Sequence, residues 1–309
     1  MPPVLRLESP ARVQLHSALP PTLAWTYDGH LPGPTIEVRR GQAVEIEWVN
    51  ALTGAFPVTV VRCGATPSHR GQEEGLRHPQ NEPGSTSAIP VTFSMTASNH
   101  LPPWTVVHVH GGRTAADADG WTENAFLPRD IQPSSQRCLY SNDQRAAMLW
   151  YHDHAMGITR LNVYAGLAGV WIVRDEEEDA LALPDGSYEI PLLIQDRNLE
   201  VKDDLLTGRL LHKVEDDVGA IPNPDDRTME FFGPFTLVNG RIWPRCPVER
   251  GAYRLRVLNG SNARTYQLVL LDEAGIVRNN LIRQIGSDRR CRARARDPSL
   301  SGDRRGRCE

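Results

Sequence analysis

The sequence lacks the features that mark several classes of protein. It contains no run of about 20 apolar residues, so a transmembrane helix is excluded and we expect no membrane partner. The five cysteines are scattered, odd in number and without a CxxC pair, which excludes a disulfide framework and a cysteine zinc site. The start at Met1 has no basic stretch followed by an apolar one, so no secretory signal is evident and we expect a cytoplasmic chain.

Lysine is nearly absent from the chain. Lys202 and Lys213 are the two examples, and arginine supplies the other 32 of the 34 basic residues. The formal net charge of −4 argues against a nucleic-acid-binding surface spread over the whole molecule. We therefore expect no nucleic-acid partner.

Residues 288–309 differ in kind from the rest of the chain. They hold eight arginines and one large apolar residue, Leu300, so they cannot form a core strand and we expect a disordered tail. An out-of-frame reading of a GC-rich gene encodes Arg- and Ala-rich peptide of this kind, so we hypothesise a frameshift at about codon 288. The alternative is a true basic tail that binds an anionic partner.

The body of the chain has the pattern of short strands. It carries 25 Gly and 24 Pro, and its apolar residues alternate, as at Val44, Ile46 and Trp48. Alternation with period two indicates half-buried strands, and many short strands between turns favour a sandwich, so the predicted fold class is all-β. Residues 79–90 and 175–179 are expected to be loops or linkers, and no segment of useful length has convincing helical periodicity. Later strands are expected at 105–110, 147–153, 167–173, 188–195, 253–258 and 265–271.

A pattern near the start of the chain occurs again in its second half. The segments 27–50 and 238–259 share, in the same order, a turn with glycine, a proline, an Arg-Gly pair and an alternating strand that ends in asparagine. A repeat of this length indicates duplicated domains, which we place at 1–180 and 185–287. The second copy has fewer residues than the first before the composition changes at 288, so we expect it to be incomplete.

Four of the ten histidines form two His-x-His pairs, His108-Val109-His110 and His152-Asp153-His154. On a strand, residues i and i+2 point to the same face, so each pair can direct two imidazoles into one site. Both pairs follow apolar residues typical of strands. Imidazole binds copper, zinc, iron and nickel, so we predict a metal site formed by these histidines.

The residues leave the identity of the metal open. Zinc hydrolysis generally uses a motif such as HExxH, which is absent. A non-haem iron site requires two histidines and one carboxylate, for which His108, His110 and Asp119 could serve. A copper site requires neutral imidazoles, which both pairs offer.

Several neighbours of the pairs have structural interpretations. Asp153 lies between two histidines and points to the opposite face of its strand, so we expect it to support the fold. Trp150 and Trp121 are interpreted as core or wall residues, and Met156 as a packing residue.

Five motifs run in order along residues 20–287. They are LPGPTIEVRRGQ (31–42), HVHGGRTAADADGW (108–121), WYHDHAMGITRLNVYAGLAGVWIVRD (150–175), IPLLIQDRNL (190–199) and FFGPFTLVNGRIWP (231–244). Together they resemble the multicopper oxidases, in particular the subgroup of phenoxazinone synthases, bacterial spore-coat laccases and bilirubin oxidases. The resemblance implies tandem cupredoxin-like Greek-key β-sandwiches, of which the second is incomplete here.

The resemblance also implies copper cofactors. In the family, a blue copper centre takes single electrons from phenols, aminophenols, bilirubin or metal ions, and a trinuclear copper cluster reduces O2 to water. Carried over residue by residue, His108 resembles a ligand of the lone cluster copper, and His110, His152 and His154 resemble ligands of the coupled copper pair. Asp119 matches an acid near the lone copper that helps to handle protons, and the alternative is a turn aspartate.

The motifs that the family places in its third domain, HxxHxH and HCH, are absent. After His154 the one remaining histidine is His212, and no cysteine is flanked by histidine, so the blue copper site cannot be built. Half of the cluster ligands are also missing. We therefore expect a fragment of a laccase-like oxidase, with O2 and a small reducing aromatic substrate as family partners, that is inactive alone. The alternative is a non-catalytic copper-binding or structural cupredoxin protein.

Overall fold

The computed structural model describes residues 4–63, 94–95, 103–127, 134–215, 231–287 and 290–296. The expected loop at 79–90 lies outside these residues. Within them no helix is both long and apolar enough to cross a bilayer.

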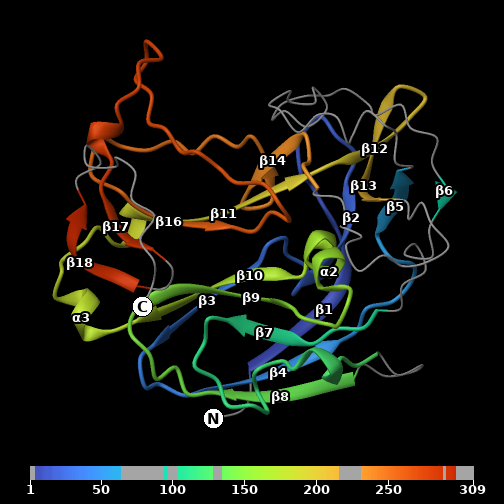
Figure 1. Cartoon of the computed structure of the whole chain (residues 1–309), viewed down its shortest axis with the longest axis horizontal. Coiled ribbons are helices and arrows are strands. Elements are labelled where there is room, and N and C mark those ends of the chain that lie inside the picture. Colours follow the sequence, from blue (N-terminus) through green and yellow to red (C-terminus); the bar gives the residue numbers. More distant parts are fainter. Residues whose placement is uncertain are drawn as a thin grey trace.

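The first part of the chain, up to residue 180, forms two four-stranded sheets, one layer above the other in Figure 1. The second part begins at residue 185. The first sheet has the order β2 (Thr22–Tyr27), β1 (Val4–Val13), β4 (Val44–Asn50), β8 (Ser134–Tyr140). The second has the order β3 (Gly33–Arg39), β10 (Ala168–Arg174), β9 (Ala147–Asp153), β7 (Val107–His110). Strands distant in sequence are neighbours in both sheets, and the predicted all-β fold is confirmed.

Aromatic side chains fill the space between these two sheets. Trp25, Tyr27, Trp48 and Tyr151 are almost fully buried. The ring of Tyr27 lies 5.0 Å from that of Tyr151 and 5.6 Å from that of Trp48, measured between centroids. The indole nitrogen of Trp48 donates to the hydroxyl of Tyr140 at 2.9 Å, which satisfies a polar group inside the core.

Three strands of the second part of the chain pair as three strands of the first part do. Its main sheet has the order β15 (Arg241–Ile242), β14 (Phe235–Val238), β11 (Glu189–Arg197), β16 (Arg254–Asn259). Strand β11 pairs antiparallel with β14 and parallel with β16, as β1 does with β2 and β4. The turn residues match as well, because Asp28-Gly29 and Asn239-Gly240 all have positive φ, between 48° and 76°. The predicted internal repeat is therefore present in the backbone.

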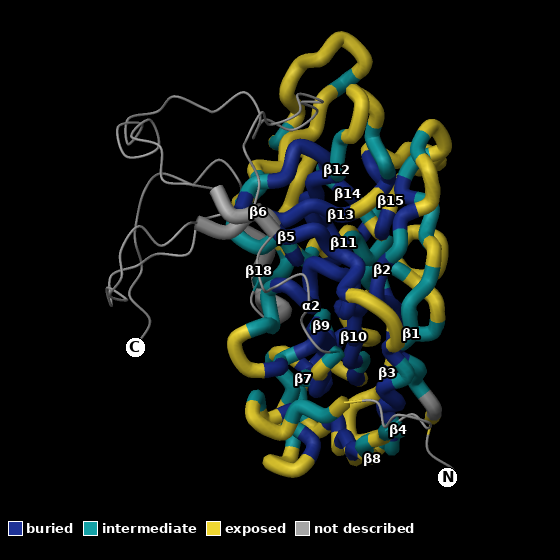
Figure 2. The backbone as a smooth tube through the Cα atoms, turned by 90° about the vertical axis from the view of Figure 1, so that its right-hand side faces the viewer, coloured by how far each residue is buried: buried dark blue, intermediate teal, exposed yellow. Residues whose placement is uncertain are grey.

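A fourth four-stranded sheet joins the two parts of the chain. It has the order β12 (Leu199–Lys202), β13 (Leu205–Glu215), β5 (Val58–Cys63), β6 (Ser94–Met95). Strand β13 pairs in parallel with β5, so a strand from the second part completes a sheet begun by the first. In Figure 2, much of the tube along β11 and the nearby strand β10 is dark blue, the colour of buried residues.

Short helices connect the strands. They are α2 (Thr159–Ala165), α3 (Glu176–Asp179), η3 (Thr122–Asn124), η4 (Gly186–Tyr188) and η5 (Asn279–Leu281). The expectation of a loop at 175–179 is wrong, because the Asp175 side chain accepts the backbone N–H of Glu178 at 2.7 Å and caps α3. The expected strand at 265–271 is also wrong, since a single bridge from Leu271 to Val277 forms there.

The arginine-rich tail is not wholly unstructured. Arg290–Arg296 form β18, which pairs antiparallel with β17 (Gln284–Ser287). The expectation of disorder from residue 288 is therefore wrong for these residues, because backbone pairing in a hairpin does not require apolar side chains. Residues 297–309 lie outside the described part of the chain.

An ion-pair network ties the second part to the first. The carboxylates of Glu178 on α3 and Glu189 on β11 are almost fully buried, and both contact Arg254 and Arg256 on β16. Arg174, at the end of β10, reaches Glu189 at 2.7 Å and Glu178 at 3.6 Å. The inward face of β16 is therefore charged, and it is neutralised by Glu178 of the first part and Glu189 of the second.

The outward face of β16 is apolar. Leu255 and Val257 alternate with the buried arginines and are exposed. Further large apolar side chains are exposed in the segment that follows, namely Leu268, Val269, Leu270, Leu271, Ile276, Val277, Leu281 and Ile282. The described residues leave this face uncovered. An incomplete second sandwich would have such a face. The division of the chain into domains at 1–180 and 185–287 stays a prediction.

Candidate metal centre

Strands β7 and β9 are adjacent, and their register brings the two His-x-His pairs together. They run antiparallel with His108 opposite His152 and His110 opposite Trp150. His154 follows the end of β9, and its backbone N–H donates to the carbonyl of Val106 at 2.8 Å. Because i and i+2 side chains share a face, both pairs point to the same side of the sheet.

The four histidines form one group, called here the histidine cluster. The ring centroid of His108 lies 4.7 Å from that of His154 and 5.7 Å from that of His110. Ligand atoms of His108, His110 and His152 all lie within 4.8 Å of one another. The structure thus brings together all four of the histidines that the sequence singled out.

Two rings of the cluster are held in a single tautomer. Nδ1 of His108 donates to the carbonyl of Asp119 at 2.6 Å, and Nδ1 of His152 donates to the carbonyl of Asp153 at 2.6 Å. A carbonyl oxygen only accepts, so Nδ1 carries the proton and Nε2 of the neutral ring keeps its lone pair. This arrangement, with a backbone acceptor behind the ring, is typical of histidine ligands of metals.

The environment of the cluster favours neutral imidazoles. Burial, assisted by the three neighbouring histidines, lowers the pKa of His152 to about 3. Burial and the nearby ring of His108 also lower the pKa of His154. Nδ1 of His154 is buried without a hydrogen-bond partner among the described residues. Neutral rings with converging nitrogen atoms, one of them without a partner, fit a metal ion that accepts imidazole ligands.

Asp119 lies behind His108 rather than among the ligand atoms. Its carboxylate Oδ1 is 3.5 Å from Nδ1 of His108, on the side of the ring that already donates to the Asp119 carbonyl. The group of ligand atoms found among the described residues contains three histidines and no carboxylate. This geometry disfavours the two-histidine, one-carboxylate iron site that the sequence left open.

A glycine turn holds Asp119 against β7. Gly120 has φ +73°, and a Cβ on it would lie 2.2 Å from the carbonyl oxygen of Val107. No other residue fits this close approach. The Asp-Gly pair is a turn signal in the sequence, but its contact with β7 becomes visible only in the structure.

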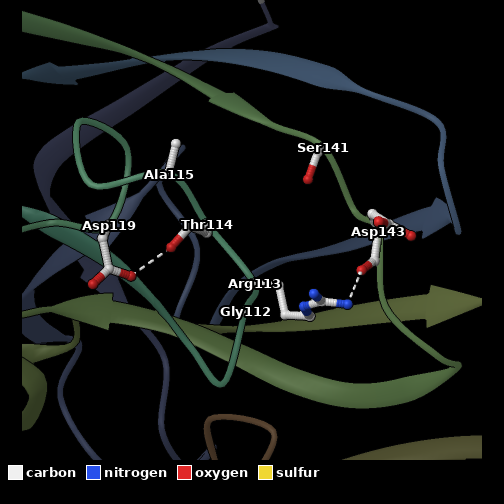
Figure 3. Close-up of a pocket in the computed structure, with 7 residues that line it drawn as sticks. All are labelled: Gly112, Arg113, Thr114, Ala115, Asp119, Ser141 and Asp143. Carbon is white, nitrogen blue, oxygen red and sulfur yellow. Dashed lines mark hydrogen bonds between the residues drawn. The ribbon is translucent and has the colours of Figure 1, made fainter.

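A shallow pocket of about 540 Å³ opens beside Asp119 (Figure 3). Thr114 lies next to Asp119 on its wall, and its hydroxyl donates to Oδ1 of Asp119 at 2.5 Å. Arg113 points the other way and donates to the backbone carbonyl of Asp143 at 3.2 Å. Sequence reasoning did not single out Thr114, because nothing in the sequence places its hydroxyl against the carboxylate.

Asp153 has the structural role expected from its position. It is fully buried on the opposite face of β9, where it accepts the backbone N–H groups of Val106 and Ala155, both at 3.1 Å, and the amide of Asn162 at 2.9 Å. Burial raises the pKa of Asp153 to about 7, although these hydrogen bonds act to lower it. Asp153 therefore anchors the entry to β7 and the start of helix α2 behind the cluster.

Trp150 forms one wall of the cluster. Trp150 stacks on His152 with centroids 4.0 Å apart, and its ring lies 5.5 Å from that of His110. Trp121 and Met156 are exposed, so Trp121 is not a core residue and Met156 is not packed in the interior, contrary to the expectation from the sequence. His212 lies elsewhere, buried on β13 and hydrogen-bonded to Asn262 at 2.8 Å.

Comparison with known proteins identifies the family. A family model described as multicopper oxidase matches residues 13–85 and 86–178. A laccase of Bacillus stratosphericus is 40% identical over 284 residues, which are 89% of this chain and 48% of the laccase. A laccase of Bacillus subtilis strain 168 is 40% identical over 286 residues, which are 89% of this chain and 47% of the laccase.

A solved structure of a multicopper oxidase is also similar to this chain. The 2F4 variant of the McoA multicopper oxidase from Aquifex aeolicus superposes with a TM-score of 0.58 and 27% identity, over 89% of this chain and 46% of that one. The chain spans about half the length of the curated relatives it matches. The matched residues contain both His-x-His pairs, and the chain belongs to the multicopper oxidase family, whose laccases are copper-dependent oxidoreductases.

Proposed function

We propose that this chain supplies half of the ligands of a trinuclear copper cluster in a laccase-like oxidase. The observation that carries the proposal is the convergence of the histidine cluster across the β7–β9 pair. In this assignment His108 binds the lone copper, and His110, His152 and His154 bind the coupled pair. In the complete oxidase, copper held by these residues would supply one-electron chemistry for the reduction of O2 to water, driven by one-electron oxidation of phenolic, aminophenolic or bilirubin-type substrates.

The residues of the chain prepare the site before any metal arrives. The carbonyls of Asp119 and Asp153 orient two rings and fix their tautomers, so these rings bind without reorganisation. The low pKa of His152 keeps its ring neutral, so no proton competes with the metal at this ligand near neutral pH. Trp150 packs on His152 and shields one side of the ring from water.

Asp119 is proposed as the acid of the site. Its carboxylate is half exposed beside His108 and faces the solvent-open pocket. A carboxylate in this position can accept a proton from water in the pocket and pass it on, while it lies behind the ring of His108. Asp119 therefore has access to solvent protons without being a ligand.

We further propose that the chain does not complete the oxidase reaction alone. A blue copper site requires a cysteine thiolate together with histidines. No cysteine of the sequence is flanked by histidine. Cys138 is buried on β8, which belongs to a different sheet from the strands β7 and β9 of the histidine cluster. The histidine cluster would then be a half-site that binds copper weakly.

The experiment is a copper titration of the purified full chain, followed by dialysis and metal analysis. We expect copper binding that His152→Ala weakens and that dialysis removes, without blue absorbance and without oxidation of phenols. Stoichiometric copper after dialysis would favour a non-catalytic copper-binding protein. Blue absorbance or phenol oxidation coupled to O2 consumption would overturn the proposed inactivity, and no copper binding would overturn the site itself.

A further inference from the structure

We propose that Thr114 is a positioning residue of the copper site, which acts by holding the carboxylate of Asp119 behind His108. The inference rests on the proposed copper-binding function and extends it to a residue outside the histidine cluster. It concerns the strength of His108 as a ligand.

Three contacts connect Thr114 to the ring. The hydroxyl of Thr114 donates to Oδ1 of Asp119 at 2.5 Å (Figure 3). The same oxygen lies 3.5 Å from Nδ1 of His108. Nδ1 also donates to the backbone carbonyl of Asp119 at 2.6 Å. The proton on Nδ1 thus faces both a carbonyl and a carboxylate, and Thr114 fixes the position of the carboxylate.

The hydrogen bond from Thr114 matters because few other groups fix the position of the Asp119 carboxylate. The Asp119 side chain is 48% exposed and borders the open pocket. Among the described residues, Thr114 donates the hydrogen bond to the Asp119 carboxylate. The neighbouring Arg113 donates instead to the backbone carbonyl of Asp143. Without the hydroxyl, the carboxylate is free to turn toward water, where hydration replaces the lost contact.

The rotamer of Thr114 is itself constrained. Its methyl group lies close to Gly112, where an added Cβ would approach Cγ2 of Thr114 to 3.2 Å. A β-branched side chain has few accessible χ1 rotamers. Gly112 thus gives Thr114 space for its methyl group in the rotamer that directs the hydroxyl to Asp119.

A negative charge behind Nδ1–H strengthens Nε2 as a metal ligand. The carboxylate polarises the N–H bond and raises electron density in the ring, the effect that carboxylates have behind metal-bound histidines. Loss of such an outer partner typically costs 10–100-fold in metal affinity. Thr114 therefore sets copper affinity through Asp119, without touching the metal.

The experiment compares the full chain with Thr114→Val, Thr114→Ser, Asp119→Asn and His108→Ala, by Cu(II) titration and by electron paramagnetic resonance of the loaded protein. Thr114→Val keeps the shape of the side chain without its hydroxyl, so we expect about a tenfold loss of affinity. Its spectrum should shift toward that of His108→Ala. Thr114→Ser keeps the hydroxyl and should restore most of the affinity and the wild-type spectrum.

A double variant and a matched control separate this role from a general effect on folding. In Thr114→Val with Asp119→Asn, we expect no further loss relative to Asp119→Asn alone, because Thr114 acts through that charge. Thr207→Val removes a hydroxyl in the β12–β13 hairpin, where it bonds Glu200 at 3.2 Å, and should leave copper binding unchanged. Wild-type affinity and spectrum in Thr114→Val, or an additive loss in the double variant, would overturn the inference. Absence of copper binding by the wild-type chain would instead overturn the proposed function.

Discussion

Nε2 of His152 lies 3.3 Å from Nδ1 of His110, although the two residues are 42 positions apart in the chain. His152 is buried, whereas His110 is exposed at the edge of the cluster. The two nitrogen atoms belong to different His-x-His pairs, so the contact joins the pairs into one potential site. Metal binding should therefore depend on both strands.

The first prediction concerns this joint dependence. Replacement of His152 by Ala removes a ligand atom that lies within 4.8 Å of two others, so copper affinity should fall by at least about tenfold. His30→Ala is the matched control, because His30 is exposed and its Nδ1 contacts the carbonyl of Asp28 in the turn after β2. Equilibrium dialysis against a copper indicator measures the copper affinity of both variants. Equal affinity of the two variants would contradict the assignment of His152.

The second prediction concerns the turn that carries Asp119. Gly120 and Gly41 have the same φ of +73°, but a Cβ on Gly120 would clash with the carbonyl of Val107, whereas a Cβ on Gly41 meets open space. Gly41→Ala should cost about 1 kcal/mol of unfolding free energy, from backbone strain alone. Gly120→Ala should cost at least about 3 kcal/mol, because the turn must also move away from β7. Urea unfolding of both variants provides the comparison, and equal losses would show that the close approach is unimportant.

The sequence was sufficient to predict the strands that carry the site. Strands at 105–110 and 147–153 were expected, and β7 and β9 occupy 107–110 and 147–153. The period-two rule also placed both histidines of each pair on one face. The register of β7 against β9 could not be predicted, because it depends on pairing between residues 40 or more positions apart.

Local patterns failed where tertiary contacts decide the structure. The apolar run at 268–271 has the composition of a strand, yet the backbone there makes a single bridge, and the side chains are exposed. Strand propensity is expressed only when a partner strand is available. The contact between Thr114 and Asp119 was missed for a related reason, since side-chain direction in a loop is set by the whole turn.

The third prediction concerns pH and a buried acid below the site. Glu8 on β1 is fully buried, and the Thr105 hydroxyl donates to it; burial raises its pKa from 4.5 to about 8. Below pH 4.5 the carboxyl is protonated in both the folded and unfolded states. As the pH rises toward 8, the unfolded state ionises first, so Glu8 should lower stability by up to about 1.4 kcal/mol per pH unit.

Glu8→Gln removes this dependence because glutamine stays neutral. The stability of the variant relative to wild type should therefore increase between pH 5 and pH 8, as measured by urea unfolding at several pH values. Glu273→Gln changes an exposed glutamate and should show no such trend. A constant difference between Glu8→Gln and wild type over this range would contradict the raised pKa.

The fourth prediction concerns Asp153. Its carboxylate accepts three hydrogen bonds inside the protein, so Asp153→Ala leaves three buried donors without partners. Each such donor costs about 1–3 kcal/mol, and the variant should lose about 3 kcal/mol or more of unfolding free energy. Asp185→Ala, at an exposed position whose side chain makes no capping hydrogen bond, should lose less than about 0.5 kcal/mol. Similar losses in the two variants, measured by chemical denaturation, would contradict the anchoring role.

The last prediction concerns the ion pairs that join the two parts of the chain. Glu178 and Glu177 are neighbours on α3, and both contact arginine, but the Glu178 side chain is 5% exposed and that of Glu177 is 62% exposed. Glu178→Ala leaves Arg254 and Arg256 buried with Glu189 as the remaining carboxylate, and breaking a buried pair in this way costs about 3–5 kcal/mol. Glu177→Ala breaks contacts with Arg40 and Arg145 that are exposed to water, so the loss should stay below about 1 kcal/mol. Thermal unfolding followed by tryptophan fluorescence distinguishes the two, and added salt should reduce only the smaller effect, because buried pairs are poorly screened. If the two variants unfold at the same temperature, the network does not hold the second part against the first.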